Sequence, residues 1–211
     1  MGKWVGLGCL GIIVLVALVG GVVAFGSYNS LVGLSQGVDA QWAQVENVYQ
    51  RRADLIPNLV ATVQGAANFE KGTLEAVTEA RASVGRMQVD VSKLPNDPAA
   101  FAKFEQAQAG LSGALSRLMV VVERYPELKA NQNFRDLQVQ LEGSENRITV
   151  ERMRYNEKAQ DYNTSRLRLP ARIFASMMGF GEKAYFKAQA GAEQAPKVQF
   201  DFGKPAPSPA R

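Results

Sequence analysis

The residues that could do chemistry in this chain are few, and their types restrict which chemistry is open to it. The 211 residues include no histidine and a single cysteine, Cys9. The chain therefore lacks the usual general base and the usual nitrogen ligand for a metal ion, and it can form neither a CxxC site nor an internal disulfide. We therefore expect that the protein is not an enzyme and that it has no catalytic residue and no cofactor. We also expect no metal, an all-carboxylate Mg²⁺ or Ca²⁺ site being the one metal option left.

One string matches a catalytic pattern. Residues 33–37, GLSQG, fit the G-x-S-x-G sequence of a hydrolase nucleophile. That motif requires a strand-to-helix turn and a histidine base. Here the string lies in a stretch with helical spacing of apolar residues, in a chain without histidine, so we discard it.

A polar cluster interrupts the apolar pattern at residues 51–58, RRADLIPN. Arg52 stands at a position that helical spacing turns toward the core, where an unpaired guanidinium is costly. We therefore expect a carboxylate partner on the last long helix, where the candidates are Glu142, Glu145 and Glu151, and we select Glu145. We also expect Arg52→Leu to destabilise the fold by leaving a buried carboxylate without its partner.

Pro57 adds a second feature to this cluster, because it removes the amide that would bond the carbonyl of Ala53 and should kink the helix. Asn58 lies one turn beyond Asp54, so its amide could bond the freed carbonyl. Together with Arg52 and Glu145, these residues form a predicted buried polar network that fixes the register of the helices. The alternative is a small-ligand or partner site built on the kink.

The segment from Tyr162 to Gly181, YNTSRLRLPARIFASMMGFG, combines three arginines and abundant apolar surface with no acidic residue. If the helices alternate in direction, this segment returns to the membrane surface, where each arginine could contribute about 1 kcal/mol with anionic lipid. The predicted membrane-surface or interface residues are Arg166, Arg168, Arg172, Phe174, Met177 and Phe180. Two alternatives are that the apolar residues close the end of the bundle, or that they contact a second protomer.

The N-terminal region has no charged residue between Lys3 and Asp39. Its first part, Trp4 to Phe25, is apolar throughout and would form a helix of about 33 Å, enough to cross a bilayer. This run is longer than the apolar region of a signal peptide. Residues 24–26, AFG, nevertheless resemble a cleavage site, so cleavage is the alternative that the sequence leaves open.

The charges that flank this span are unequal. Lys3 and the α-amino group precede it, whereas residues 27–50 contain no Lys or Arg. The positive-inside rule then predicts a single-pass protein with its N-terminus in the cytoplasm and the larger part outside.

The remaining apolar residues follow helical spacing in four segments, which predicts an all-α fold. The first segment continues from the span to a turn near residues 68–72, and the second begins at Thr73. The third begins at Pro98 after an Asp97 cap and ends at Tyr125-Pro126, and the fourth begins after Asn131 or Asn133 and ends at Leu169-Pro170. We predict a transmembrane helix at 1–26, a long antiparallel four-helix bundle at 27–181, and at 182–211 a C-terminal extension with a disordered Pro-rich tail.

Two blocks of the sequence are distinctive, RRADLIPNLV (51–60) and YPELKANQNF (125–134), within a stretch that runs from YNSLVGLSQGVDAQWAQVENVYQRRADLIPNLVATVQG (28–65) to APKVQF (195–200). In these residues the chain resembles the LemA family of bacterial membrane-anchored proteins. The resemblance implies one membrane helix, a long four-helix bundle and no known catalytic activity. Some members of the family take part in building or remodelling internal bacterial membranes.

We therefore expect a non-enzymatic, membrane-anchored scaffold in the bacterial inner membrane. Its expected partners are the lipid bilayer, further copies of itself or another protein, and not nucleic acid, because Arg and Lys alternate with Glu along the helices. The alternative function is a membrane-anchored sensor that binds a small ligand or partner.

Overall fold

The computed structural model describes residues 2–65, 69–87 and 93–187, with side chains from Gly11 onward. Within these ranges every regular element is a helix, so the predicted all-α class is confirmed. The helices are α1 (Gly2–Gln64), α2 (Lys71–Arg86), α3 (Pro98–Val122), α4 (Pro126–Ala130), α5 (Gln132–Leu167) and α6 (Ala171–Ala175).

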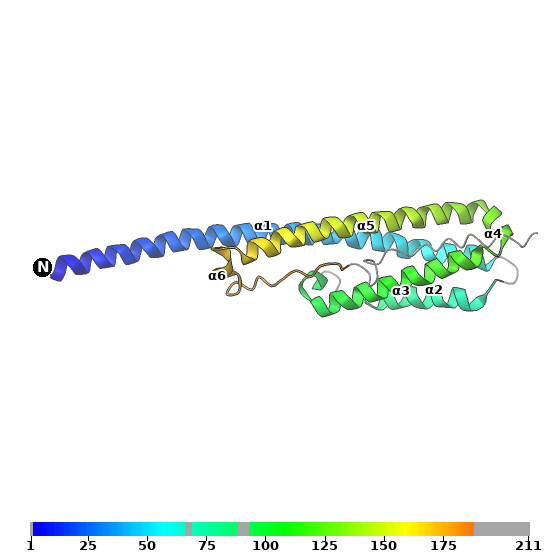
Figure 1. Cartoon of the computed structure of the whole chain (residues 1–211), viewed down its shortest axis with the longest axis horizontal. Helices are drawn as coiled ribbons and strands as arrows, with labels where there is room; N and C mark the ends of the chain where they lie inside the picture. Colours follow the sequence, from blue (N-terminus) through cyan, green and yellow to red (C-terminus); the bar gives the residue numbers. More distant parts are fainter. Residues whose placement is uncertain (1, 66–68, 88–92, 188–211) are drawn as a thin grey trace, which may run out of the picture.

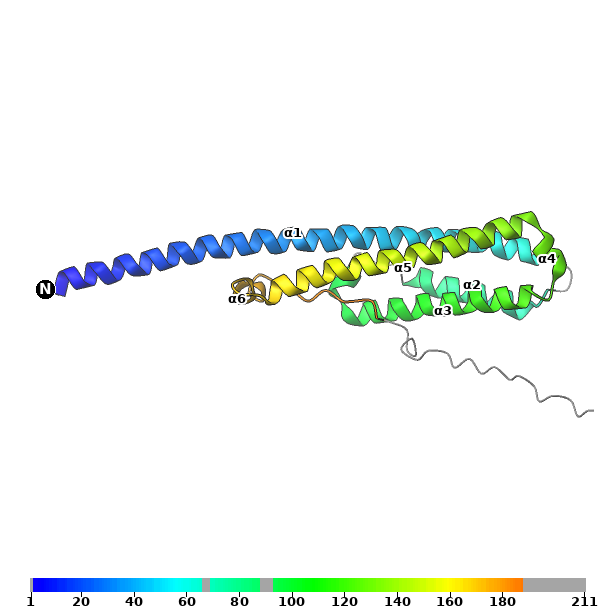
Figure 2. The same cartoon turned by 45° about the horizontal axis from the view of Figure 1, so that its top comes forward.

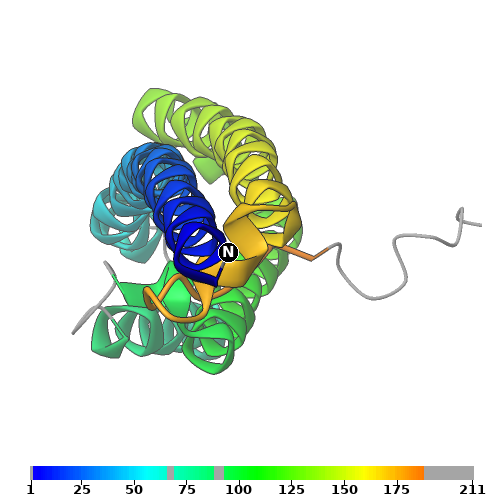
Figure 3. The ribbon, with the colours of Figure 1, turned by 90° about the vertical axis from the view of Figure 1, so that its left-hand side faces the viewer.

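The four long helices alternate in direction and lie side by side (Figures 1 and 2). α5 packs along α1 over most of its length, and α2 pairs with α3. Viewed from the N-terminus, α5 lies against one side of α1 and the α2–α3 pair lies against another (Figure 3). The N-terminal part of α1 projects alone beyond the other helices (Figure 1).

α1 is one helix of 63 residues, and Pro57 lies inside it without ending it. The carbonyl of Ala53, which Pro57 deprives of its usual amide, accepts a hydrogen bond of 3.1 Å from Arg81 Nε on α2. The sequence predicts Asn58 in this role, and that prediction is wrong. Arg81 takes this role because α2 runs beside this turn of α1, and the bond ties the two helices together.

Local sequence signals explain where α3 and α5 begin. Asp97 caps α3 by accepting hydrogen bonds of 3.0 Å from the amides of Ala99 and Ala100. Asn131, rather than Asn133, caps α5 by accepting from the amide of Phe134 at 3.3 Å. These side-chain oxygens satisfy amides that have no partner within the first turn of a helix.

The buried apolar residues form two clusters along the length of the molecule. The proximal core, nearer the N-terminal projection, consists of Leu31, Val38, Trp42, Val45, Tyr49, Leu94, Phe101, Phe104, Ile148, Tyr155, Ala159, Tyr162, Ala175 and Phe186. The distal core consists of Ile56, Leu59, Val63, Leu74, Val77, Val84, Leu111, Leu115, Leu118, Val122, Leu128, Phe134 and Leu141. α1 contributes to both, and its stripe passes from one to the other at Arg52.

Residues 181–187, which we call the strap, form an extended segment that packs against the helices. Lys183 and Phe186 within it are buried. The strap therefore belongs to the helical body, although the predicted boundary assigned residues from 182 onward to an appended extension. The rest of that extension, including the predicted Pro-rich tail, lies outside the described residues.

Candidate functional site

Arg52 occupies the boundary between the two cores, and its side chain is 1% exposed. Its Nη1 donates to Glu145 Oε1 at 2.6 Å and to Ser112 Oγ at 2.8 Å, and its Nη2 donates to Gln108 Oε1. The guanidinium also lies 5.2 Å from the ring centroid of Tyr49. We call Arg52, Gln108, Ser112 and Glu145 the Arg52 centre. It joins α1, α3 and α5 through one cation.

The structure brings Arg52 and Glu145 together but leaves Asp54 and Asn58 outside the network. Both are exposed, and Asp54 accepts a hydrogen bond from Gln50 Nε2 at 2.7 Å instead. At about 100° per residue, positions two and six beyond Arg52 lie about 200° and 240° around the helix, on the side that faces away from the core. The predicted network is therefore wrong for Asp54 and Asn58, because the helix turns both of them away from Arg52.

Sequence reasoning missed Gln108 and Ser112, the partners on α3. Gln108 is 5% exposed and stands between Phe104 and Leu111 in the buried stripe of that helix. A polar residue at a core position was the signal that singled out Arg52, and the same signal would have found Gln108. Ser112 carries no such signal, because its role depends on which residue faces it.

The chemistry available at the Arg52 centre is charge compensation. The Glu145 side chain is 42% exposed, so this carboxylate keeps part of its hydration while it neutralises the buried guanidinium. A groove of about 600 Å³ runs beside the centre, between α3 and α5, and includes Glu105 and Arg152 in its lining. Within the described residues, no group of three or more His, Cys, Asp or Glu side chains could hold a metal ion.

The strap is fixed to α5 by two consecutive Tyr-Asn pairs that are seven residues apart. Asn156 exchanges two hydrogen bonds of 2.9 Å with the backbone of Phe186, and Asn163 does the same with Lys183 at 2.9 and 3.0 Å. Seven residues of helix rise about 10.5 Å, and three residues of extended chain span about 10 Å. This match allows both amides to bind one straight segment.

The tyrosines of the two pairs repeat this three-residue offset. Tyr155 donates its hydroxyl to the carbonyl of Ala184 at 3.0 Å, and Tyr162 donates to Gly181 at 2.9 Å. Burial raises the pKa of both phenols, and the Asp39 carboxylate raises that of Tyr155 further. Both therefore stay protonated at neutral pH and remain able to donate.

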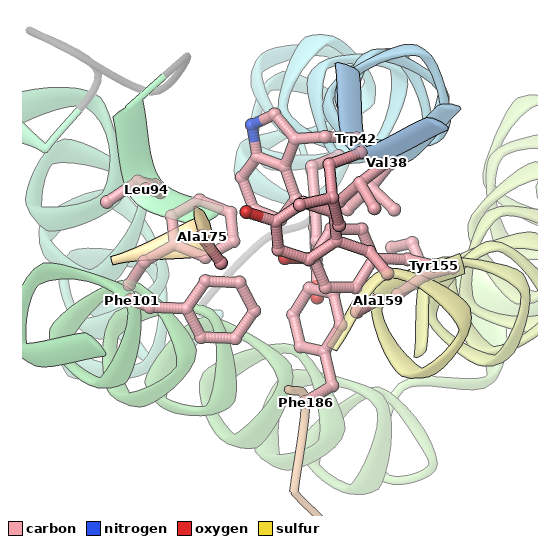
Figure 4. Close-up of a cluster of buried hydrophobic side chains, with 14 residues drawn as sticks. Val38, Trp42, Leu94, Phe101, Tyr155, Ala159, Ala175 and Phe186 are labelled. Atoms are coloured by element: carbon pink, nitrogen blue, oxygen red, sulfur yellow. The ribbon is translucent and has the colours of Figure 1, made fainter. Parts of the chain in front are cut away.

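The strap also reaches α1 and the proximal core. Lys183, whose side chain is 3% exposed, donates from Nζ to Asp39 Oδ1 at 2.8 Å. Figure 4 shows Phe186 among the rings of Trp42, Phe101 and Tyr155, whose centroids lie 5.9, 4.7 and 5.4 Å from its own. The strap therefore supplies a central side chain of the proximal core.

The segment predicted to lie at the membrane surface forms the end of α5, α6 and the turn that follows. Arg168, Arg172 and Met177 are exposed, whereas Phe174 and Phe180 are half-buried. Phe180 meets the ring of Tyr28 at 5.7 Å, and the guanidinium of Arg166 lies 3.7 Å from the Glu182 carboxylate. The structure thus places three of the six residues toward solvent and the other three against the body.

α1 is the one helix in the described part of the chain that is long and apolar enough to cross a membrane. Its apolar side chains between Gly11 and Phe25 are exposed or half-exposed, and its buried stripe begins only at Leu31. A stretch of apolar helix whose side chains pack against no other part of the chain, as between Gly11 and Phe25, is typical of a membrane span.

The model of the LemA family matches residues 41–200, which include the C-terminal part of α1 from residue 41 onward, all the other helices and the strap. The chain belongs to the LemA family. It is 28% identical over 175 residues to Magnetosome protein MamQ 2 of Paramagnetospirillum magneticum, with 76% of this chain aligned. It is 27% identical over 174 residues to Magnetosome protein MamQ of Magnetospirillum gryphiswaldense, with 75% aligned. The match covers 64% of the length of these curated relatives.

Together, the apolar helix and the family fit a single-pass membrane protein of the LemA family. The direction in which α1 crosses the membrane stays a prediction from the flanking charges.

Proposed function

We propose that this LemA-family protein is a non-enzymatic scaffold that holds a helical body at a bacterial membrane and organises or remodels that membrane. The observation that supports it most directly is the continuity of α1, which passes from an exposed apolar stretch into the buried stripe of both cores. A helix without a break transmits the orientation of the span to the body. A flexible tether would not.

The relatives support a role in membrane organisation. MamQ is named a magnetosome protein in two organisms. We propose that the present chain likewise contributes to the organisation of a membrane.

The arrangement of polar groups supports a non-enzymatic role. The most deeply buried cation, Arg52, has its terminal nitrogens engaged by Glu145, Gln108 and Ser112. The buried Lys183 is engaged by Asp39. Groups used in this way stabilise the contacts between helices and are not poised to exchange protons with a substrate.

An outward face of α5 supports assembly with further protein. Val139, Val150 and Met153 are exposed, and helical geometry places them within an arc of about 60°. Exposed apolar side chains on one side of a helix offer a surface for a protein contact, and the exposed Asn146 adds a polar group to it. We propose that this face joins copies of the chain.

The test is crosslinking of the full chain in its native membrane, with a photoreactive residue at Val139 or, as a matched control, at the exposed Ser116. We expect a ladder of self-crosslinks from position 139 and none from position 116, and we expect the chain to stay in the membrane pellet after an alkaline carbonate wash. Release by the wash would overturn the anchor. Equal crosslinking from both positions, or self-crosslinks from neither, would overturn the scaffold.

A second candidate function, a membrane-anchored sensor, is favoured by the groove beside the Arg52 centre. Its lining pairs basic and acidic side chains, Arg52 and Arg152 with Glu105 and Glu145. A zwitterionic small molecule would match that lining. A panel of amino acids that raises the melting temperature of the wild-type chain, but not of Arg152→Gln, would favour the sensor, and no shift would exclude it for this class of ligand.

A further inference from the structure

We infer that residues 167–178, which we call the collar, dock onto an anionic lipid surface, so that the helical body has a second contact with the bilayer that α1 crosses. The inference rests on the proposed membrane anchor and specifies how the body sits on the membrane. In it, the apolar side chains of the collar enter the interfacial region, and Arg168 and Arg172 contact lipid phosphates.

The position of the collar is the first support. α6 packs against α1, and Phe180 contacts Tyr28 at a centroid separation of 5.7 Å. Tyr28 lies three residues beyond Phe25, where the apolar stretch of α1 ends, which is about 5 Å along the helix axis. Figure 1 shows α6 at the end of the body that faces the N-terminal projection. The collar is therefore at the level where α1 would leave the hydrocarbon.

Exposure of large apolar side chains is the second support. Five such side chains are exposed within the twelve residues of the collar: Leu167, Leu169, Ile173, Met177 and Met178. Leu169 and Met177 are 74% and 83% exposed. Exposed apolar groups at this density are typical of a surface that contacts a partner when the protein functions. The apolar surface of the collar is continuous with the exposed span of α1, so we take lipid to be that partner.

Charge is the third support. Arg168 and Arg172 are exposed and adjacent, with the amide of Arg172 bonded to the carbonyl of Arg168 at 2.9 Å. Residues 162–181 contain no acidic side chain, and the part of α1 that packs nearby is uncharged as far as Val38. Glu182 lies close to Arg166. The two exposed arginines thus present positive charge next to apolar groups, the combination that binds anionic membrane surfaces.

The experiment uses the full chain in a Cys9→Ser background, reconstituted in nanodiscs of phosphatidylcholine with or without phosphatidylglycerol. Nitroxide labels are attached to Met177→Cys in the collar, to Val120→Cys as a matched exposed apolar control on α3, and to Val16→Cys in the span. Collision with oxygen, which concentrates in lipid, is compared with collision with a water-soluble nickel chelate.

We expect the label at position 177 to favour oxygen in discs that contain phosphatidylglycerol, and the label at position 120 to favour nickel. Adding Arg168→Gln and Arg172→Gln should lower the ratio of docked to undocked collar by about fivefold per arginine in anionic discs. It should have little effect in phosphatidylcholine alone.

Two results would overturn docking. One is equal nickel access at positions 177 and 120. The other is spin–spin broadening at 177 that disappears on dilution with unlabelled chain, which would identify a second copy as the partner. The label at position 16 separates this failure from failure of the anchor, because lipid exposure at 16 with water exposure at 177 rejects the collar contact alone.

Discussion

The proximal and distal cores share α1 but are closed in different ways. Seven of the fourteen buried residues of the proximal core are aromatic, whereas Phe134 is the one aromatic among the thirteen of the distal core. The proximal core also contains the strap, held by side-chain amides and hydroxyls. The distal core is built by helices alone.

This difference follows from the helices available at each end. α2 and α3 lie beside the part of α1 remote from the N-terminus, while α6 and the strap lie beside its nearer part (Figure 1). Aliphatic side chains fill the narrow spaces between packed helices. Where a helix is replaced by an extended segment, larger rings fill the wider space and hydrogen bonds satisfy the backbone of that segment. The packing of the proximal core therefore depends on the short strap, whereas that of the distal core does not.

The largest expected effect is on the strap. Phe186→Ala should lower the free energy of unfolding by about 3–5 kcal/mol, because it removes a buried ring that contacts three others. The measurement is urea unfolding of the full chain in detergent micelles, followed by circular dichroism. Lys187→Ala is the control, because that residue is exposed and uses only its backbone to bond Arg152 and Glu105. Equal losses for both variants would contradict a central role for Phe186.

The next effect concerns the boundary between the cores. Arg52→Leu should cost about 2–3 kcal/mol, because it strands the buried amide of Gln108 and removes hydrogen bonds to a charged group. Glu145 is half-exposed and regains hydration in the variant, so the loss of its partner contributes less to the destabilisation than the buried carboxylate predicted from the sequence would. The same unfolding experiment measures the loss.

A double variant tests this explanation. Arg52→Leu combined with Gln108→Leu should recover part of the stability, because the double variant no longer contains the buried amide that Arg52→Leu leaves unpaired. A double variant that is less stable than the single one would show that Gln108 is not the stranded group.

Alkaline pH should weaken the proximal core more than the distal core. Tyr155 has a pKa raised above its usual value of 10.0, mainly by burial. Above pH 10 the unfolded chain releases this proton while the folded chain retains it, so the contribution of Tyr155 to stability is complete below pH 10 and falls by about 1.4 kcal/mol per pH unit above it.

Tyr155→Phe should reduce the fall of stability with pH above pH 10. It should also lower the stability at neutral pH, because it removes the hydrogen bond to the carbonyl of Ala184. The measurement is the urea midpoint of both proteins between neutral pH and pH 11. Identical slopes would mean that Tyr155 is not the titrating group.

The smallest effects are expected outside both cores. Asp54→Asn and Asn58→Ala should change the stability by less than about 0.5 kcal/mol, because both residues are exposed and neither bonds Arg52. Thermal unfolding of the two variants is the measurement. A loss of stability as large as that of Arg52→Leu would mean that Asp54 and Asn58 do belong to the Arg52 network, and it would contradict this prediction.

The sequence allowed more of the fold to be predicted than of the site. The spacing of apolar residues located the buried stripe of α1, and the Asp97 and Asn131 caps located the start of α3 and α5. The short α4 and the strap were missed, because five residues of helix and seven of extended chain are too short for a periodic pattern.

The sequence by itself determined the features that lie within a single helix. The charge-free stretch of α1, its buried stripe and the presence of Arg52 within that stripe all follow from residue order and the 3.6-residue period. Only the tertiary structure decided which residues meet across helices: Gln108 and Ser112 at Arg52, Arg81 at the carbonyl of Ala53, and the strap on Asn156 and Asn163. The physical reason is register, because the partner of a side chain depends on how far two packed helices slide and rotate, and no local pattern in either helix fixes that.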